Sequence, residues 1–456
     1  MWKQRLKLFL TFFDSRFEDL NKKNWIPTVY RDFSAGLIVA LTAIPLAMGF
    51  AMAMGLRPEQ GIIAGALACL VGRIWGGSKY QVYGPTAAFI PIIYSLMQKY
   101  QLGHDFAYAH GMLVLVSMIA GIVLMLMGLA GLGKIVQRFP YPIVIGFTIG
   151  IAVTIVLSNI GDILGLRTEV KGDLFEKLKI IYAHLNEFNI YALLLGLLTF
   201  ILSRYLLKIS VFIPAPLIAL AVGMLVPMFF NNTGLILIKD KYGHIPTNFF
   251  VFTPPTIPDP TWDVCFDILY YVAAIIFVSG IESLLCSTMA DQLAQNKKTP
   301  FNPDKEFWGQ GLVQVIVPMI NGFPCTGALA RTATSIKAGA VTPLAGFFKG
   351  VLKLILAYYL ASWLEKVPMT CIGGILLWVA SNMINPNEIR HVFQNGKYDA
   401  FLMTYTAVMV PLTDFLTGVL SALAIYAIGN YFTQSPAPES RPSVDDSSKD
   451  ITSKSA

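Results

Sequence analysis

The sequence predicts an all-α polytopic membrane protein, and two observations carry that prediction. Of the 456 residues, 55% are hydrophobic and 13% are charged, about half the charged fraction of roughly 25% that soluble domains have. Apolar runs of 14 to 24 residues recur from Ser34 to Phe432 with no long polar stretch between them. This pattern indicates one large membrane domain and excludes a soluble multidomain enzyme.

Charged or Gly/Pro-rich breaks divide this region into fourteen apolar segments, which we predict to be transmembrane helices or parts of them. They are 34–55, 61–76, 85–98, 107–127, 141–164, 190–207, 212–230, 266–290, 307–320, 327–337, 343–364, 370–384, 398–413 and 414–432. We expect the polar residues 1–33 to form a cytoplasmic N-terminal segment. The Ser/Pro/Asp/Lys-rich residues 433–456 are expected to form a disordered cytoplasmic tail.

The distribution of basic residues predicts the orientation in the membrane. A net charge of +7 would suggest a nucleic-acid partner for a soluble chain, but here the location of the charge matters more, and no such partner is expected. With a cytoplasmic N-terminus and fourteen crossings, the inner side holds 22 Lys and Arg residues and the outer side holds 9. This bias is typical of membrane proteins, so we expect a multi-pass protein of the inner (plasma) membrane with both termini in the cytoplasm. The N-terminus has no cleaved signal peptide pattern.

Several of the fourteen segments, notably 85–98 and 327–337, are too short for the roughly 20 residues that a full crossing needs. Each of these two follows a Gly/Pro-bearing stretch, so we expect half-helices that begin inside the membrane. They are the third and the tenth segments, seven apart, which predicts a 7+7 inverted repeat with halves near 34–232 and 262–432. Paired interrupted segments of this kind point to the central site of a transporter.

The residues at the two breaks are those expected at helix starts. At the first, Pro85 is predicted at the first helical position after Gly84; at the second, Thr326 is the candidate N-cap. Two helix N-termini facing each other near the bilayer midplane would present unpaired N–H groups and partial positive charge, which together favour an anion. The alternative is a pair of ordinary re-entrant helices whose ends are satisfied by water.

Arg331 and Glu282 are the charged residues that lie deepest in apolar segments. A charge facing lipid is costly, by roughly 3 kcal/mol or more, so both should face a cavity or a partner. Arg331 would add a full positive charge to the anion site. Glu282 would carry a coupling proton or, with Ser283, Cys286 or Ser287, form part of a cation site; a structural Glu282–Arg331 pair is the alternative. Lys349 and Lys353 are expected to extend toward the inner face.

The chain shows none of the common enzyme or metal motifs. We find no His-Glu-x-x-His, Gly-x-Ser-x-Gly or phosphate-binding loop, and the five cysteines have no metal-site spacing. The sequence therefore predicts no enzyme activity, no bound metal and no cofactor.

Taken together, these segments resemble the SulP anion transporters, also called solute carrier family 26, over roughly Asp32 to Phe432. The most specific stretches are Ala43–Ala51, Gly84–Thr86, Gly309–Gly311, Thr326–Thr334, Lys337–Gly339 and Thr342–Pro343. The resemblance implies a core domain of segments 1–4 and 8–11 and a gate domain of segments 5–7 and 12–14, commonly in a homodimer. It also implies an anion held between segments 3 and 10.

Carried over by motif, the residues that would line the site lie at the two half-helix starts and on the first segment. They are Thr86, Ala87, Ala88, Gly327, Ala328, Leu329, Ala330, Arg331, Pro45, Ala47 and Phe50. Glu282 occupies the acidic position that the family links to proton or cation coupling. Sodium-coupled bicarbonate carriers of the family have Asp there and hydroxyl-bearing residues in place of Cys286 and Leu329. The family usually also ends in a cytoplasmic STAS domain, which this sequence lacks.

We therefore expect a secondary transporter of a small anion, namely bicarbonate, sulfate or a dicarboxylate, working in the lipid bilayer by alternating access. Proton symport through Glu282 is the favoured coupling. Four alternatives stay open: a sodium-coupled bicarbonate symporter, an uncoupled anion channel, a nucleobase carrier of the same architecture, and a scaffold or receptor that transports nothing.

Overall fold

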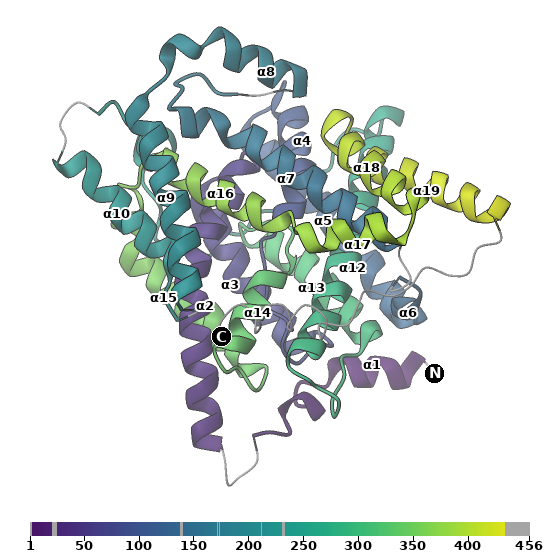
Figure 1. Cartoon of the computed structure of the whole chain (residues 1–456). Coiled ribbons are helices and arrows are strands. Elements are labelled where there is room, and N and C mark those ends of the chain that lie inside the picture. Colours follow the sequence, from purple (N-terminus) through teal and green to yellow (C-terminus); the bar gives the residue numbers. More distant parts are fainter. Residues whose placement is uncertain are drawn as a thin grey trace.

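The computed structural model describes residues 2–20, 25–136, 140–170, 172, 174–210, 212–229 and 233–433. Most of the described residues lie in helices (Figure 1). Within the described residues, seven helices are long and apolar enough to cross a membrane. The tail predicted to be disordered falls, from residue 434 on, outside the described residues.

Every apolar segment predicted from the sequence overlaps a helix. In the first half these are α2 (Trp25–Ala53), α3 (Pro58–Trp75), α4 (Ile90–Gln101), α5 (Phe106–Ala130), α7 (Tyr141–Leu164), α9 (Ile190–Ile209) and α10 (Ala215–Phe229). In the second half they are α12 (Trp262–Leu293), α13 (Pro303–Met319), α14 (Leu329–Lys337), α15 (Leu344–Leu364), α16 (Met369–Met383), α18 (Lys397–Leu412) and α19 (Phe415–Thr433).

Shorter helices lie before and between these segments. They are α1 (Trp2–Leu10), η1 (Ser15–Phe17), η2 (Ala87–Phe89), α6 (Gly133–Val136), α8 (Leu174–Ala183), η3 (Leu185–Glu187), α11 (Ile238–Tyr242) and α17 (Pro386–Asn395). Helix α1 lies across the end of the bundle at which α2 begins, and α8 lies at the opposite end (Figure 1).

Helix α2 begins at Trp25, nine residues before the apolar segment predicted at Ser34. The helix can include the charged Asp32 because its side chain, although fully buried, is hydrogen-bonded. Its carboxylate accepts hydrogen bonds from the backbone N–H of Val341 at 2.7 Å and from the hydroxyl of Thr342 at 2.5 Å. A buried carboxylate satisfied in this way can be accommodated inside a helix bundle.

The long helices pack in two groups. The first group contains α2 to α5 and α12 to α15, with α5 against α13 and α2 against α15. The second contains α7, α9, α10, α16, α18 and α19, with α7 against α16 and α18. Close packing in the first group depends on glycine: a Cβ on Gly121 of α5 would lie 2.5 Å from the carbonyl oxygen of Gly311 on α13. The two backbones therefore touch directly, as small residues allow in membrane bundles.

Candidate functional site

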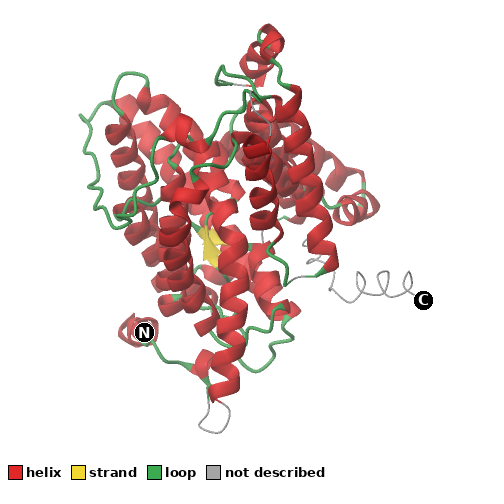
Figure 2. Ribbon diagram, turned by 90° about the vertical axis from the view of Figure 1, so that its left-hand side faces the viewer, coloured by secondary structure: helices red, strands yellow, loops and turns green. Residues whose placement is uncertain are grey.

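A two-stranded sheet lies at the centre of the bundle (Figure 2). Strand β1 (Tyr83–Gly84) pairs antiparallel with β2 (Thr326–Gly327), with Tyr83 opposite Gly327 and Gly84 opposite Thr326. The chain leaves β1 into η2 and α4, and leaves β2 into α14. The pairing therefore holds two helix starts from opposite halves of the sequence next to each other.

The two helices begin later than the sequence suggested. Thr86 is the N-cap of η2, so Pro85 precedes the helix instead of occupying its first position. Ala328 is the N-cap of α14, because Thr326 belongs to β2 and its hydroxyl donates to the Ser279 carbonyl oxygen at 3.2 Å. Neither N-cap side chain bonds to its helix. The first backbone N–H groups therefore have no side-chain cap, and such groups attract an anion.

Arg331 joins the two helix starts. It lies in the first turn of α14 and is 6% exposed. Its Nη2 donates a hydrogen bond to the carbonyl oxygen of Pro85, just before the other helix. Its Nη1 is buried and has no hydrogen-bond partner among the described residues. One arm of the guanidinium is thus structural, and the other can donate to a ligand.

Glu282 approaches the same place from α12. Glu282 lies near Arg331 and Thr86, both of which interact with its carboxyl group. Among the described residues, Glu282 and Arg331 are nevertheless too far apart to form an ion pair. Glu282 Oε2 and Thr86 Oγ1 are both buried without a hydrogen bond of ordinary geometry within the described part of the chain. Buried polar atoms in a native structure normally have partners, so these atoms, like Arg331 Nη1, indicate a place for a polar ligand.

All three side chains line one cavity of about 300 Å³. Other lining residues that the sequence singled out are Phe50, Ala87, Gly327, Ala328, Leu329 and Ala330. The second helix group supplies the opposite wall, which includes Phe147 and Trp378. From the helix starts, the cavity extends to Tyr141 at the start of α7 and to Glu388 on α17.

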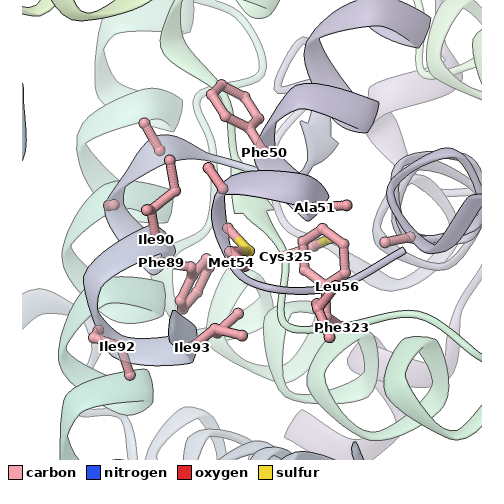
Figure 3. Close-up of a cluster of buried hydrophobic side chains, with 14 of the residues drawn as sticks. Phe50, Ala51, Met54, Leu56, Phe89, Ile90, Ile92, Ile93, Phe323 and Cys325 are labelled. Carbon is pink, nitrogen blue, oxygen red and sulfur yellow. The ribbon is translucent and has the colours of Figure 1, made fainter. Parts of the chain in front are cut away.

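On another side, the lining residue Phe50 packs into a closed apolar cluster (Figure 3). Met54 and Leu56 from the end of α2 meet Phe89 and Ile93 there, and each is fully buried. This cluster separates the helix starts from the end of the bundle where α2 ends. The residues that line the cavity do not extend past this cluster.

Six residues named from the sequence do not line the cavity: Pro45, Ala47, Ala88, Ser283, Cys286 and Ser287. Ala47 and Ala88 are fully buried in the packing behind it. Ser283 Oγ donates to Glu306 at 2.6 Å, and Cys286 Sγ lies 3.2 Å from the Thr332 hydroxyl. Neither residue is among those that line the cavity, although Cys286 lies one turn after Glu282 on the same face of α12.

Glu306 was not identified from the sequence, yet it organises the polar groups behind β1. It is fully buried in the first turn of α13. Its Oε2 accepts from the backbone N–H of Gly77 at 2.8 Å and of Ser78 at 3.1 Å. Its Oε1 accepts from Gln81 Nε2 at 2.7 Å, and from the hydroxyls of Tyr83 and Ser283 at 2.6 Å each. Five donors thus satisfy one carboxylate and fix the strand that starts the first half-helix.

Lys349 and Lys353 correct a prediction, because they do not reach the inner face. Both are fully buried on α15. Lys349 Nζ donates to the Tyr83 carbonyl oxygen at 2.9 Å, and Lys353 Nζ donates to the Gly61 carbonyl oxygen at 3.2 Å. Helix α3 leaves room for them: a Cβ on Gly65 would lie 2.2 Å from Lys353 Nζ. In the sequence, the small residues at every fourth position of α3 were the signal that could have predicted this groove for the lysines.

The model of the Sulfate permease family matches residues 29–406. The chain belongs to the sulfate permease family. The putative sulfate transporter YvdB of Bacillus subtilis is 34% identical over 414 residues, which cover 91% of this chain and 75% of YvdB. The bicarbonate transporter BicA of Picosynechococcus is 25% identical over 398 residues, 85% of this chain and 68% of BicA. The chain is therefore a membrane anion transporter of the sulfate permease family, and its relatives are not enzymes.

Two solved structures share the fold of this sulfate permease family chain. The transmembrane domain of a cyanobacterial bicarbonate transporter BicA superposes with a TM-score of 0.77 at 22% identity, covering 88% of this chain and 98% of that one. The murine anion transporter Slc26a9 in the inward-facing state gives a TM-score of 0.76 at 16% identity, covering 90% and 70%. At these identities the likeness concerns the fold alone.

Proposed function

We propose that this chain is a secondary active transporter that carries a small anion by alternating access, driven by a proton. The observation that carries the proposal is the cavity of about 300 Å³ at two uncapped helix starts. Arg331 and Thr86 line it, and Arg331 Nη1 has no hydrogen-bond partner among the described residues. Such a site supplies an anion with backbone N–H groups, a hydroxyl and a guanidinium.

Sulfate, bicarbonate and a small dicarboxylate are the candidate substrates. The relatives named above are described as sulfate and bicarbonate transporters, and all three anions are small enough for the cavity. A guanidinium arm matches two oxygens of a planar or tetrahedral oxyanion. Sulfate is our first candidate, because the relative with 34% identity is a putative sulfate transporter.

The helices support fourteen crossings in two inverted sevenfold halves, with the first helix group as core and the second as gate. The half-helices α4 and α14 occupy corresponding places in the two halves and meet at β1 and β2. In a plasma membrane with both termini on the cytoplasmic side, the cavity would open to the cytoplasm past Tyr141 and Glu388. We propose an inward-facing conformation and, for the assembled protein, a homodimer.

Glu282 is the proposed proton carrier. Its Oε2 is buried beside the cavity, and an anion entering next to a carboxylate is repelled unless that carboxylate takes up a proton. Binding of the anion and of the proton would then favour each other. The Ser283 hydroxyl is already bonded to Glu306 and the Cys286 thiol to the Thr332 hydroxyl, which makes a sodium site around Glu282 the weaker alternative. A channel that uses the same helix ends is the other.

Ligand-dependent thermal stability tests the site without any assumption about coupling. We expect sulfate to raise the melting temperature of the purified protein in detergent, since a ligand at 100 times its Kd stabilises by about 2.7 kcal/mol. The Arg331→Gln variant should lose the shift, while Arg57→Gln, at the far end of the bundle, should keep it. Stabilisation by uracil but by no anion would favour the nucleobase carrier. No shift with any of these ligands would contradict the proposed site.

A further inference from the structure

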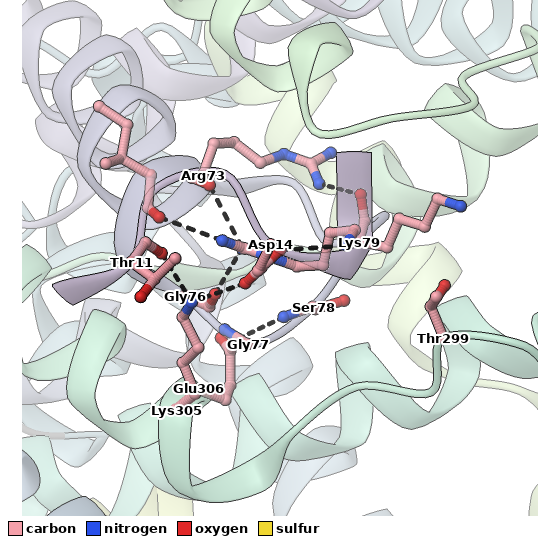
Figure 4. Close-up of polar contacts among 12 residues, drawn as sticks. Thr11, Asp14, Arg73, Gly76, Gly77, Ser78, Lys79, Thr299, Lys305 and Glu306 are labelled. Carbon is pink, nitrogen blue, oxygen red and sulfur yellow. Dashed lines mark hydrogen bonds and ion pairs between the residues drawn. The ribbon is translucent and has the colours of Figure 1, made fainter. Parts of the chain in front are cut away.

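The N-terminal segment, residues 5–19, is attached to the first helix group by a set of hydrogen bonds and ion pairs (Figure 4). Arg16, 4% exposed, donates to three carbonyl oxygens at the end of α3: those of Arg73 at 3.3 Å, Ile74 at 3.1 Å and Gly76 at 2.5 Å. The last carbonyl groups of a helix lack partners within the helix, and a cation there is favourable. Arg16 therefore caps α3.

Further contacts join the segment to α13 and α5. Asp14 forms ion pairs with Arg16 at 2.8 Å and with Lys305 at 2.6 Å. Phe9 is 1% exposed and packs on the ring of Trp308 with the centroids 5.8 Å apart. Arg5 Nη1 donates to the Leu129 carbonyl oxygen at 2.9 Å. The segment is thus fixed to the ends of three helices of the first group.

The other side of this segment is apolar and uncovered. Leu6 is 39% exposed, Leu10 is 50% exposed and Phe13 is 78% exposed. Leu6 and Leu10 are four residues apart on α1 and share one face of that helix. Polar contacts hold the segment to the protein while large apolar side chains point outward, which is the reverse of the usual arrangement at a water-exposed surface.

Basic residues accompany this apolar face. Helix α1 has no acidic residue and contains Lys3, Arg5 and Lys7. Lys7 is exposed, and so is Lys134 on α6; Gly131, three residues before Lys134, approaches the Arg5 guanidinium. A helix with leucine on one face and lysine beside it, followed here by the exposed Phe13, is typical of segments that lie in the headgroup layer of a membrane.

We infer that residues 5–19 form a membrane-surface anchor, which inserts Leu6, Leu10 and Phe13 among anionic lipid headgroups while it stays fixed to the first helix group. This inference uses the orientation in the proposed function, which places the segment at the cytoplasmic leaflet. Apolar insertion and basic charge are the two signals that together give stable anchoring. Because Arg16 and Asp14 tie the segment to α3 and α13, the anchor sets the height of that helix group relative to the lipid surface.

A fluorescent label at position 13 tests the anchor in the full-length protein. An NBD group on Phe13→Cys, in a Cys265→Ser background that removes the exposed native cysteine, is followed in nanodiscs of phosphatidylcholine with or without phosphatidylglycerol. The matched control label is at Lys297→Cys, an exposed residue in the loop before α13. We expect lipid-borne nitroxide to quench the label at 13 but not the label at 297, and quenching at 13 to increase with phosphatidylglycerol.

Charge removal gives the second readout. The Lys7→Gln change, at an exposed side chain that should leave folding intact, is expected to weaken the contact on the order of fivefold. Quenching of the label at 13 by aqueous iodide, independent of lipid charge, would overturn the inference. So would protection that depends on a second copy of the chain in the disc instead of on lipid. Neither result needs substrate, so a failure here leaves the proposed transport activity standing.

Discussion

Arg331 Nη2 donates a hydrogen bond to the carbonyl oxygen of Pro85, so a guanidinium on one half-helix holds the start of the other. The two residues come from opposite halves of the chain. Because the second arm of the guanidinium lines the cavity, the contact that joins the halves and the charge that attracts an anion belong to one side chain. Loss of Arg331 should therefore affect both the binding of the anion and the geometry of its site.

Replacing Arg331 by Gln should raise the KM for the transported anion on the order of tenfold to a hundredfold, because a hydrogen bond to a charged group contributes about 1.5–3 kcal/mol. Arg331→Lys keeps the charge but loses the two-armed geometry, so its KM should lie between those of the wild type and Gln variants. The concentration dependence of uptake into proteoliposomes measures this. Equal KM values in all three proteins would show that Arg331 does not bind the transported anion.

Replacing Glu282 by Gln should abolish proton-driven accumulation while leaving binding of the anion in place. The amide has the shape of the protonated acid but cannot release a proton, so the anion can bind and coupling is lost. Exchange of labelled for unlabelled anion without a gradient, compared with uptake under an inward proton gradient, separates the two. Proton-driven accumulation at the wild-type level would show that the proton moves elsewhere.

Replacing Glu306 by Gln should destabilise the protein by about 2–4 kcal/mol, since the amide nitrogen would face donors that now meet a carboxylate oxygen. The matched control is Asp304→Asn, in the same turn of α13, where one described hydrogen bond reaches the carboxylate, from the Gly133 N–H at 3.1 Å. Thermal unfolding in detergent measures both. If the two variants unfolded at the same temperature, Glu306 would not have the organising role described above.

Replacing Lys349 by Met should cost about 1–3 kcal/mol of stability, because the Tyr83 carbonyl oxygen loses a buried donor while the groove on α3 stays filled. A lysine that extended to the inner face would tolerate Met with little change. Lys337→Met, at an exposed lysine of α14, is the control. Equal melting temperatures for the two variants would show that Lys349 does not form a stabilising buried hydrogen bond.

Asp14 gives the attachment of the N-terminal segment a predictable pH dependence. Burial alone would raise the pKa of Asp14, but the hydrogen bonds and charges of Arg16 and Lys305 outweigh it and hold the pKa below its ordinary value of 3.8. A lowered folded-state pKa means that this contribution is fully present above the unfolded-state value and is lost as the pH falls through the folded-state value. The segment should therefore stay docked at pH 5 and above.

The Asp14→Asn variant should remove that dependence and loosen the segment at neutral pH. Limited proteolysis between residues 5 and 20, followed from pH 7 to pH 3, compares the variant with the wild type. A wild-type segment that becomes susceptible already near pH 6 would indicate a histidine or another group as the titrating one.

The sequence was sufficient to locate the two half-helices and the two charges between them. At the two breaks, Gly and Pro stand where the backbone leaves a short strand and enters a helix, and an isolated charge in an apolar segment is costly enough to need a cavity. These arguments placed Arg331 and Glu282 beside the starts of α14 and α4. They could not place Ser283 and Cys286, because the groups that bind these side chains, Glu306 and Thr332, come from other helices.

Glu306 and Lys349 were missed for a related reason. Each lies near the polar end of a helix, where a charge in sequence looks solvated, and each is buried by segments far away in the chain. Glu306 is satisfied by residues 77–83 and Ser283, and Lys349 lies in a groove of α3. Tertiary contacts between the two halves decide both positions, and only the small residues at every fourth position of α3 indicate the groove for Lys349.

Uptake into proteoliposomes under defined gradients tests the central claim most directly. Labelled sulfate, bicarbonate and fumarate are each offered with an inward proton gradient, with an inward sodium gradient, or with neither, to the wild-type protein and to Glu282→Gln. We expect accumulation of one anion above its equilibrium level only with the proton gradient and only in the wild type. Flux that merely equilibrates under all three conditions, in both proteins, would contradict a proton-coupled carrier and indicate a channel.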